Sequence, residues 1–419
     1  MKYQAPRGTQ DILPEEQPWW DCVYRTVARL AREYRYALIE TPIFEDAGLF
    51  TRLGEATDVV SKEMYIFKDR GDQELALRPE GTAPVCRAYL EHGMQNHPQP
   101  VRLWYTAPNF RYDRPQAGRY REHHQFGVEA IGDEDPAIDA EVIEMLWRLY
   151  EELGLTGLTL HLNSIGDQNC RPRYLAKLRE YYSDKLDQIC EDCRGRYEKN
   201  PLRLLDCKNE RCQPIIAGAP AFSDYLCDAC RDHFARLRGH LDDVGIAYTL
   251  NPRLVRGLDY YTRTVFEIEP MEAGGQSSLG GGGRYDGLIE QLGGKPTPGI
   301  GFGTGIERII INLKRQEVPL PEQPALEVYV AYQTPAARSV AFKLASDLRR
   351  AGVSSVVASG ERSLKAQMRH ADHLKANRVA IIGDRELADG TVTLKDLREG
   401  GKQTTIPLID VVRQLDDQG

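Results

Sequence analysis

FRYDRPQAGRYREHHQFGVE, residues 110–129, is the stretch of the chain that decides the fold. We predict strands at residues 101–107 (VRLWYTA) and 124–131 (HQFGVEAI), and Pro115 and Gly118 interrupt the segment between them. The stretch should therefore form a strand–loop–strand unit. It carries four arginines within eleven residues (Arg111, Arg114, Arg119 and Arg121) and ends on Glu129, which is set among apolar residues.

The size and composition of the chain are those of a globular protein with more than one domain. It has 419 residues and a formal net charge of −8, and no apolar run has membrane-spanning length. The first residues lack the apolar core of a signal peptide, so a cytoplasmic location is expected. The pI of about 5.7 argues against a protein coated in basic charge for non-specific nucleic-acid binding, although a local basic surface remains compatible with it.

Hydrophobic periodicity outlines the remaining elements. We predict an amphipathic helix over 18–37, and a helix and strand follow the opening stretch within 135–167. Residues 170–242 are predicted to be mainly helical, and 262–270 to be a strand. The prolines of 314–327 mark a linker before an α/β segment, 325–419, which holds 14 Lys and Arg against 12 Asp and Glu.

Two glycine-rich segments, 280–287 (GGGGRYDG) and 301–309 (GFGTGIERI), are candidates for a ligand site. The first lacks the lysine ending of a phosphate-binding Walker loop. The second is not followed by an acidic residue on a strand, as a dinucleotide-binding fingerprint requires. The glycines more plausibly let a strand and a helix pack closely beneath a ligand.

Arginines from distant parts of the chain could converge on a polyanion. A guanidinium is planar and permanently charged, and it binds phosphate oxygens with two parallel hydrogen bonds. The candidates are Arg111, Arg119, Arg121, Arg256 and Arg308. The alternative is that the arginines of the loop are surface charges paired with Asp113 and Glu122.

Several of these segments resemble motifs of class II aminoacyl-tRNA synthetases. FRYDRPQAGRYREHHQ is similar to motif 2 and GIGFGTGIERI to motif 3, and the region of the first helix and Pro42 is similar to motif 1. LRPEGTA (77–83), LVRGLDYYTRTVFE (254–267) and LGGGGRYDGL (279–288) are similar to segments of the histidyl-tRNA synthetase family in particular. The resemblance runs from RGTQD near the N-terminus through the C-terminal segment.

The resemblance implies a fold, an activity and partners. The fold would be an α+β catalytic domain with the class II antiparallel sheet and a helical insertion, plus a C-terminal α/β anticodon-binding domain. The domain boundaries would be 1–169 and 243–318 for the two parts of the catalytic domain, 170–242 for the insertion, and 325–419 for the anticodon-binding domain. The activity would be the joining of L-histidine to ATP with Mg²⁺, followed by transfer of histidine to tRNA(His). Motif 1 implies a homodimer.

The resemblance also implies roles for individual residues. Arg111 would hold the α-phosphate, and Arg256 would act on the same centre beside the substrate carboxylate. Arg308 and Arg119 would bind the triphosphate, with Arg121 as a helper. Histidine would be held by Glu80, Thr82 and Gln125 at its amino group and by Glu129 and Tyr261 at its ring, with Tyr260 adjacent. The turn at Gln116 would meet the acceptor end of the tRNA.

Two positions depart from the pattern of the family, and one alternative function remains. Asp113 stands where a glutamate usually helps to hold adenine, which leaves that contact open. His123 replaces an aromatic residue, and we expect it to pack. A non-catalytic, synthetase-like regulatory subunit of histidine biosynthesis would explain the overall likeness. Such proteins typically lack the C-terminal domain and part of the arginine set, whereas this chain keeps both.

Six of the nine cysteines lie between residues 190 and 230. In a cytosolic protein they are more plausibly thiols or metal ligands than disulfides. Two CxxC pairs, Cys190 with Cys193 and Cys227 with Cys230, could form a structural zinc site and leave Cys207 and Cys212 over. Thiols that pack between helices are the alternative, and a zinc-organised RNA-binding module would explain the cysteines but none of the arginines.

Overall fold

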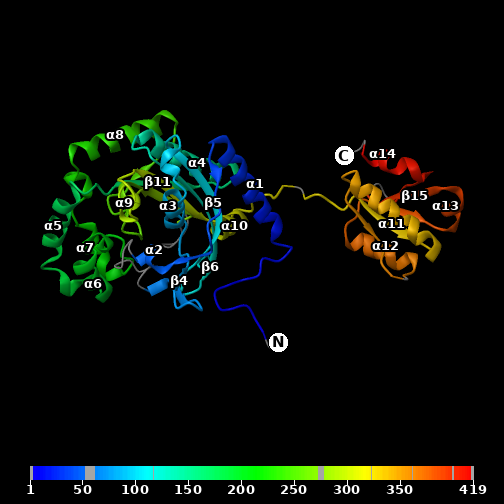
Figure 1. Ribbon diagram of the computed structural model, residues 1–419, viewed down its shortest axis with the longest axis horizontal. Helices are drawn as coiled ribbons and strands as arrows, with labels where there is room; N and C mark the ends of the chain where they lie inside the picture. The colour runs from blue at the N-terminus through cyan, green and yellow to red at the C-terminus, as the bar shows by residue number, and fades with distance from the viewer. Residues whose placement is uncertain are drawn as a thin grey trace. The chain divides into compact units, whose positions relative to one another are not determined.

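The structure is a computed structural model that describes residues 3–51, 62–116, 118–271, 278–321, 323–360, 362–398 and 401–416. The chain forms two compact units, residues 1–320 and 321–419 (Figure 1). The division falls inside the proline-rich segment that the sequence marks as a linker. The boundaries expected inside the first unit, near residues 170 and 242, stay predictions.

An eight-stranded sheet organises the first unit, in the order β1-β5-β6-β11-β10-β9-β7-β8. Neighbouring strands are antiparallel except at the two edges, where β1 pairs with β5 and β7 with β8 in parallel. The strands are β1 (Ala37–Leu38), β5 (Val101–Phe110), β6 (Glu122–Ile131), β7 (Leu158–Ser164), β8 (Thr249–Leu250), β9 (Thr262–Pro270), β10 (Gly280–Arg284) and β11 (Gly299–Gly305).

The opening stretch folds into the predicted strand–loop–strand unit. Strands β5 and β6 pair in register from Val101 opposite Ile131 to Phe110 opposite Glu122. Both strands are therefore longer than expected at the end that meets the loop. Near the tip, Gln116 and Arg119 form an isolated antiparallel bridge, so the arginines lie on an ordered turn.

Side-chain alternation gives β6 two different faces. Phe126, Val128 and Ala130 are buried in one core together with apolar residues of the helices α1 (Gln17–Glu33), α4 (Pro136–Glu152), α8 (Asp228–Asp243) and α10 (Ile306–Arg315). Because successive side chains of a strand point to opposite faces, Gln125, Gly127 and Glu129 face the other side. That second face carries the candidate site.

The first helix follows the predicted pattern but is shorter than expected. Val23, Val27 and Leu30 are fully buried on its inner face. The prediction extended to residue 37, whereas α1 ends at Glu33. Arg35 has a positive φ of 62°, which a right-handed helix cannot contain, and the chain turns there into β1.

A fully buried ion pair joins the glycine-rich strand to α4. Arg284 Nε donates to Asp139 Oδ1 at 2.7 Å, and neither side chain is exposed. Thr264 Oγ1 donates to the other carboxylate oxygen at 2.6 Å. Removing one partner would leave a buried charge uncompensated, so it would lower the free energy of unfolding by about 3–5 kcal/mol. The arginine of GGGGRYDG is therefore structural.

The predicted helical insertion is part of the same unit. It contains the helices α5 (Arg171–Tyr182), α6 (Glu191–Lys199), α7 (Gln213–Ala217) and α8, linked by short 3₁₀ turns. A separate three-stranded sheet, β2-β4-β3, lies earlier in the chain. Its elements and their neighbours are β2 (Phe44–Asp46), α2 (Ala47–Thr51), β3 (Tyr65–Lys68), β4 (Glu74–Leu77), α3 (Thr82–Glu91) and, later in the chain, α9 (Leu288–Gln291).

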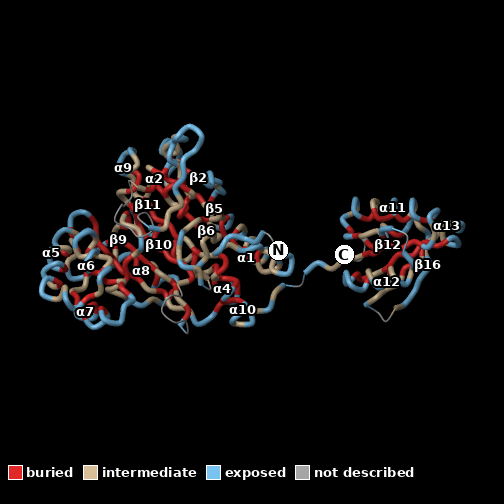
Figure 2. The backbone as a smooth tube through the Cα atoms, turned by 90° about the horizontal axis from the view of Figure 1, so that it is seen from below, coloured by how far each residue is buried: buried red, intermediate tan, exposed pale blue. Residues whose placement is uncertain are grey.

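The second unit is the α/β domain expected from the sequence. Its sheet has the order β13-β12-β14-β15-β16, with parallel pairing around β12 and antiparallel pairing at β15 and β16. Figure 2 shows its buried segments at this sheet. Its elements are β12 (Val328–Tyr332), α11 (Pro335–Arg350), β13 (Ser355–Val357), α12 (Leu364–His373), β14 (Arg378–Ile382), α13 (Asp384–Asp389), β15 (Thr391–Asp396), β16 (Gln403–Pro407) and α14 (Val411–Asp416). Among the helices of the described residues, none is long and apolar enough to cross a membrane.

Candidate functional site

Glycines form the floor of a site on the second face of the large sheet. A Cβ atom on Gly301 would lie 2.0 Å from Glu129 Oε2, and one on Gly303 would lie 2.2 Å from Gln125 Nε2. One on Gly127 would lie 2.3 Å from the ring of Tyr105. Only glycine leaves room for these side chains to lie flat on the sheet, which explains the glycine-rich strand β11 without a nucleotide-binding loop.

Glu129 lies at the centre of this floor with its side chain fully buried. Three hydroxyl groups donate hydrogen bonds to it: Thr82 Oγ1 at 2.7 Å, Tyr285 Oη at 2.6 Å and Tyr105 Oη at 3.3 Å. Burial raises the pKa of Glu129 to about 8, although the hydroxyls of Tyr285 and Thr82 oppose the rise. When it ionises, such a carboxyl is a strong acceptor for a ligand that brings its own N–H donors into the pocket.

Glu80 is a second buried carboxylate, held at the start of α3. Its two oxygens accept hydrogen bonds from the backbone N–H groups of Thr82 at 2.7 Å and Ala83 at 2.8 Å. Burial raises the pKa of Glu80, and these backbone donors oppose the rise. The helix terminus thus fixes the carboxylate in place.

The tyrosines of RGLDYY and Gln125 complete the walls. Tyr260 Oη donates to Glu80 Oε2 at 3.4 Å, and the rings of Tyr260 and Tyr261 lie 4.8 Å apart. Gln125 Oε1 accepts a hydrogen bond from Asn109 Nδ2 at 2.8 Å. Thr82 therefore links Glu80 and Glu129 into one hydrogen-bonded group. Gln125 lies against Gly303, and Tyr261 lies against Gly283.

Three of the predicted arginines gather at the loop end of the hairpin. Burial lowers the pKa of the Arg308 guanidinium, and the positive charges of Arg119 and Arg111 lower it further. The same positive charges act on His123. Burial, together with the charges of Arg111 and Arg308, lowers the pKa of His123 to about 3. His123 is therefore neutral at physiological pH. The positive charges of Arg111 and Arg308, which have no carboxylate partner among the described residues, favour an anionic ligand here.

The bonds of these arginines leave donors for a ligand. Arg308 donates from Nε to the carbonyl oxygen of Gly118 at 2.9 Å and from Nη1 to that of Ser278 at 2.5 Å. Arg111 Nε donates to the carbonyl of Pro79 at 2.9 Å. Within the described residues, no carboxylate pairs with Arg111 or Arg308.

Arg119 and Arg121 are tied into the turn more firmly. Arg119 Nε pairs with Asp113 Oδ2 at 2.8 Å with its side chain 45% exposed, so the surface pairing considered as an alternative is present at this residue. The guanidinium of Arg121 lies over the ring of Tyr112 at 3.8 Å, and its backbone N–H donates to Gly8. Arg121 therefore also anchors the N-terminal segment to the hairpin.

Arg256 is the remaining predicted arginine. Its Nη1 pairs with Glu267 Oε1 at 3.1 Å, and a Cβ on Gly281 would lie 3.0 Å from it. Its buried Nε has no hydrogen-bond partner among the residues that the structure describes. A buried N–H without a partner is costly, so this donor is a candidate contact for a bound anion.

Sequence reasoning missed three residues of the site: Tyr105, Asn109 and Tyr285. Tyr285 directly follows the glycines and Arg284, and its hydroxyl makes the shortest hydrogen bond to Glu129. Tyr105 lies opposite Gly127 in the β5–β6 register. The pairing of an aromatic residue with a glycine could have pointed to Tyr105, but it can be recognised only when the register of β5 and β6 is known.

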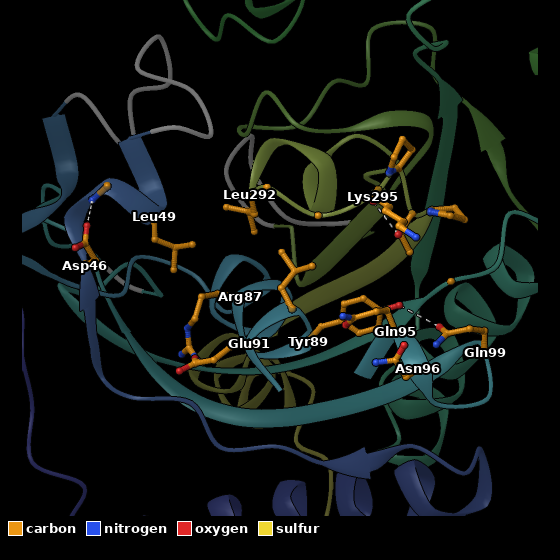
Figure 3. A pocket seen from close by; sticks show the side chains of 18 residues that line it. Asp46, Leu49, Arg87, Tyr89, Glu91, Gln95, Asn96, Gln99, Leu292 and Lys295 are labelled. Carbon is orange, nitrogen blue, oxygen red and sulfur yellow. Dashed lines mark hydrogen bonds and ion pairs between the residues drawn. The ribbon is translucent and has the colours of Figure 1, made fainter. Parts of the chain in front are cut away.

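A groove of about 1240 Å³ lies elsewhere, between α2, the end of α3 and the segment 292–298 (Figure 3). Arg87 and Glu91 form an ion pair of 2.8 Å on its wall, and Tyr89 Oη donates to Gln99 Oε1 at 3.3 Å. None of the site residues expected from the sequence is among the described residues that line it. The groove is therefore separate from the candidate site, which contains Glu80, Glu129 and the predicted arginines.

The cysteines do not group as the sequence suggested. Cys190 and Cys193 lie with Cys207 and Cys212, whereas Cys227 and Cys230 lie with Asp167 and Cys170. Of the alternatives that the sequence left open, a single site of Cys190, Cys193, Cys227 and Cys230 is therefore wrong. Both CxxC pairs begin helices, α6 and α8, and each of these helix starts is packed against a different segment.

The fold and the site together define a class of protein. The antiparallel sheet with its basic hairpin, the glycine strand running into α10 and the absence of a nucleotide-binding loop among the described residues are the features expected of a class II aminoacyl-tRNA synthetase. Sequence models agree at the finer level. Residues 8–167 and 209–309 match the family described as histidyl-tRNA synthetase, and residues 327–418 match an anticodon binding domain. The chain belongs to the histidyl-tRNA synthetase family.

Individual relatives support this membership over the whole length. A histidine–tRNA ligase of Dehalococcoides mccartyi is 56% identical over 417 residues, which cover 99% of this chain and all of that protein. One of Desulforamulus reducens is 51% identical over 404 residues, or 96% of each chain. The crystal structure of apo histidyl-tRNA synthetase from S. aureus has a TM-score of 0.84 and 39% identity, and it covers 99% of this chain and all of that one.

Proposed function

We propose that the chain activates L-histidine with ATP and transfers it to the 3′ end of tRNA(His), with the two groups of side chains on the sheet as its active site. The observation that carries the proposal is the fully buried Glu129 with its three hydroxyl donors, next to a field of arginines. The first group suits an amino acid whose side chain is a hydrogen-bonding ring. The second suits a triphosphate, which binds as its magnesium complex.

In the first step, a carboxylate oxygen of histidine attacks the α-phosphorus of ATP, the bond to the bridging oxygen breaks, and pyrophosphate leaves. This reaction needs no nucleophile from the protein. It needs the reactants to be aligned and the charge on the phosphoryl oxygens to be neutralised. Arg111 and Arg256 would neutralise that charge from two sides, and Arg308 and Arg119 would hold the leaving pyrophosphate, with Arg121 supporting the turn.

Recognition of histidine falls to the buried carboxylates and their neighbours. Glu80, Thr82 and Gln125 would hold the ammonium group. Glu129 and Tyr261, beside Tyr260, would hold the imidazole. Because Glu129 is fully buried beside the buried Tyr105 and Tyr285, a ligand without ring N–H groups would leave polar atoms unpaired and would be rejected.

In the second step, a ribose hydroxyl of the terminal adenosine attacks the carbonyl carbon of the adenylate, and AMP leaves. The turn at Gln116, which is paired with Arg119, would meet the acceptor end of the tRNA. The unit of residues 321–419 would read the anticodon, as its match to an anticodon binding domain suggests. We place these reactions in the cytoplasm, where tRNA is charged.

The decisive experiment is histidine-dependent ATP–pyrophosphate exchange with the purified chain. We expect exchange with histidine and none with the other amino acids, followed by formation of histidyl-tRNA when tRNA(His) is added. A regulatory subunit of histidine biosynthesis would bind histidine without any exchange. Absence of exchange under conditions in which histidine binds would therefore replace the proposal by that alternative.

We also propose that the chain acts as a homodimer through the region of motif 1. Large apolar side chains are exposed there, on the three-stranded sheet and just before it: Ile43 at 46%, Phe44 at 53%, Ile66 at 51% and Phe67 at 42%. The rings of Phe44 and Phe67 are 6.4 Å apart, so these two residues form one apolar patch on one face of the three-stranded sheet. A contiguous apolar patch on a folded surface is typical of a protein interface.

Sedimentation equilibrium tests the dimer. The double change Phe44→Glu and Phe67→Glu places charges in the patch, and we expect it to convert a dimer into a monomer. Phe342→Glu is the matched control, because Phe342 is 61% exposed on α11 of the other unit. A wild-type chain that sediments as a monomer, or a patch variant that remains a dimer, would contradict this interface.

A further inference from the structure

The helical insertion carries two compact groups of metal-ligating side chains. One consists of Cys190, Cys193, Cys207 and Cys212, and the other of Asp167, Cys170, Cys227 and Cys230. In each group one ligand atom from every residue lies within 4.8 Å of all the others. All seven cysteines are free thiols in the structure. Neither group contributes to the reaction described above, so their convergence needs a separate explanation.

The spacing of the first group matches a tetrahedral sulfur site. Cys190 Sγ lies 3.7 Å from Cys207 Sγ, and Cys212 Sγ lies 3.9 Å from Cys193 Sγ. Four sulfurs bound at about 2.3 Å around a tetrahedral zinc ion are separated by about 3.8 Å. The backbone N–H of Cys190 also donates to Cys212 Sγ at 3.3 Å. A donor aimed at a sulfur stabilises the thiolate form that a metal requires.

The first CxxC pair lies at the start of a helix. Cys190 is the N-cap of α6 and Cys193 is its third residue, so both thiols lie at the positive end of a nine-residue helix. Cys193, Cys207 and Cys212 are buried. Four convergent thiols in such a setting suit a soft, tetrahedral cation. We propose that Cys190, Cys193, Cys207 and Cys212 bind a structural zinc ion.

The second group connects elements that are far apart in the sequence. Asp167 follows β7, Cys170 is the N-cap of α5, and Cys227 is the N-cap of α8 with Cys230 as its third residue. Cys170 Sγ lies 3.9 Å from Cys230 Sγ and 3.6 Å from Asp167 Oδ1. Cys227 Sγ lies 4.0 Å from the same carboxylate oxygen. We infer a second zinc ion here, with three sulfur ligands and one oxygen ligand, which ties both ends of the insertion to the large sheet.

The first site also bears on the histidine pocket, and this part of the inference rests on the proposed function. Between Cys193 and Cys207, the chain carries Asn200 and Arg203. Asn200 Nδ2 donates to Asp259 Oδ1, and Arg203 Nη1 donates to the carbonyl oxygen of Arg256 at 3.2 Å. Zinc would fix the segment that supports the RGLDYY loop, so its loss should raise the KM for histidine even though the metal touches no substrate.

Metal analysis of the purified full-length chain tests both sites. We expect two zinc ions per chain in the wild type, one in Cys193→Ser, one in Cys230→Ser and none in the double variant. Cys22→Ser is the matched control, because Cys22 lies on α1 outside both groups, and it should keep two. Cobalt substituted for zinc should show the absorption of tetrahedral thiolate coordination, with weaker sulfur-to-metal bands at the three-sulfur site.

The outcomes separate the two sites from each other and from the proposed activity. A wild-type chain without zinc after expression in zinc-supplemented medium would overturn both sites. One zinc ion that disappears in Cys193→Ser but persists in Cys230→Ser would support the first site and overturn the second, and the reverse would do the opposite. If a serine variant does not fold, mercurial titration of the wild type replaces it. The sites predict stepwise release of zinc as their thiols react, and release of no zinc would overturn them. Zinc content does not depend on exchange activity, so a failed activity assay leaves this test intact.

Discussion

Glu129→Gln is expected to lower kcat/KM for histidine in ATP–pyrophosphate exchange by about 30- to 1000-fold, which corresponds to roughly 2–4 kcal/mol of lost recognition. Glutamine has nearly the same shape, but its amide nitrogen is a donor. It would face three hydroxyl donors, from Thr82, Tyr105 and Tyr285, at distances of 2.6–3.3 Å. Glutamine, unlike Glu129, cannot ionise when the ligand binds, so the substitution removes the carboxylate that would accept hydrogen bonds from the ring.

The controls for this prediction are a distant glutamate and a second substrate. Glu290→Gln changes an exposed residue of α9 and should leave the kinetics unchanged. The KM for ATP should change far less than the KM for histidine, because the arginine group is separate from the carboxylate. Exchange by Glu129→Gln within threefold of the wild type would show that Glu129 does not recognise the substrate.

The same variant also reports on the charge of Glu129 without ligand. Burial raises the pKa of this carboxyl to about 8 from an ordinary value of 4.5. In the unfolded chain the group loses its proton near pH 4.5, whereas the folded chain keeps the proton until about pH 8. Stability therefore falls as pH rises through this window. At 1.36 kcal/mol per pH unit, Glu129→Gln should gain up to about 5 kcal/mol relative to the wild type between pH 4.5 and 8 and nothing further above it.

The hairpin could be predicted because local signals specify it. Two apolar strands with Pro115 and Gly118 between them allow only a strand–loop–strand unit. Strand alternation then places Gln125 and Glu129 on one face, opposite the buried Phe126 and Val128. The convergence of Arg308 on Arg111 and Arg119 came from the family resemblance, since no local pattern relates residues so far apart.

The cysteine grouping and Tyr285 could not be predicted for a related reason. Two CxxC pairs look equivalent in the sequence, and only the path of the chain reveals that Cys212 returns to Cys193 while Cys170 reaches Cys230. The pairing of β10 with β9 shifts register at Arg284, directly before Tyr285, whose hydroxyl donates to Glu129. Such irregularities depend on tertiary packing, here on the buried pair of Arg284 and Asp139.

Arg256→Lys is expected to lower the kcat of pyrophosphate exchange by about 10²- to 10³-fold. The buried Nε of Arg256 has no hydrogen-bond partner among the described residues, while Nη1 is held by Glu267 at 3.1 Å. The side chain is therefore positioned before any anion arrives, and its free donor is available where charge develops in the reaction. Lysine keeps the positive charge but offers no planar fork, so charge alone should not restore the rate.

Single-turnover formation of the adenylate measures this effect directly, and Arg236→Lys is the matched control. Arg236 lies on α8 and forms an exposed pair with Asp135, so its replacement should leave the rate unchanged. A rate for Arg256→Lys within threefold of the wild type would remove Arg256 from the catalytic set. Glu267→Gln should cause a smaller loss, because it loosens the guanidinium without removing it.

The double variant of Arg256 and Arg111 tests whether the two arginines act on one centre. Arg111 is held from the other side by the carbonyl of Pro79 at 2.9 Å. Suppose that both guanidiniums neutralise the same phosphoryl group. Removing one of them then displaces this phosphoryl group from the other, so the second removal has less left to lose. The combined loss in kcat should then be smaller than the product of the two single losses. If the losses multiply instead, the two arginines act independently, and Arg256 would be assigned to the substrate carboxylate rather than to the α-phosphate.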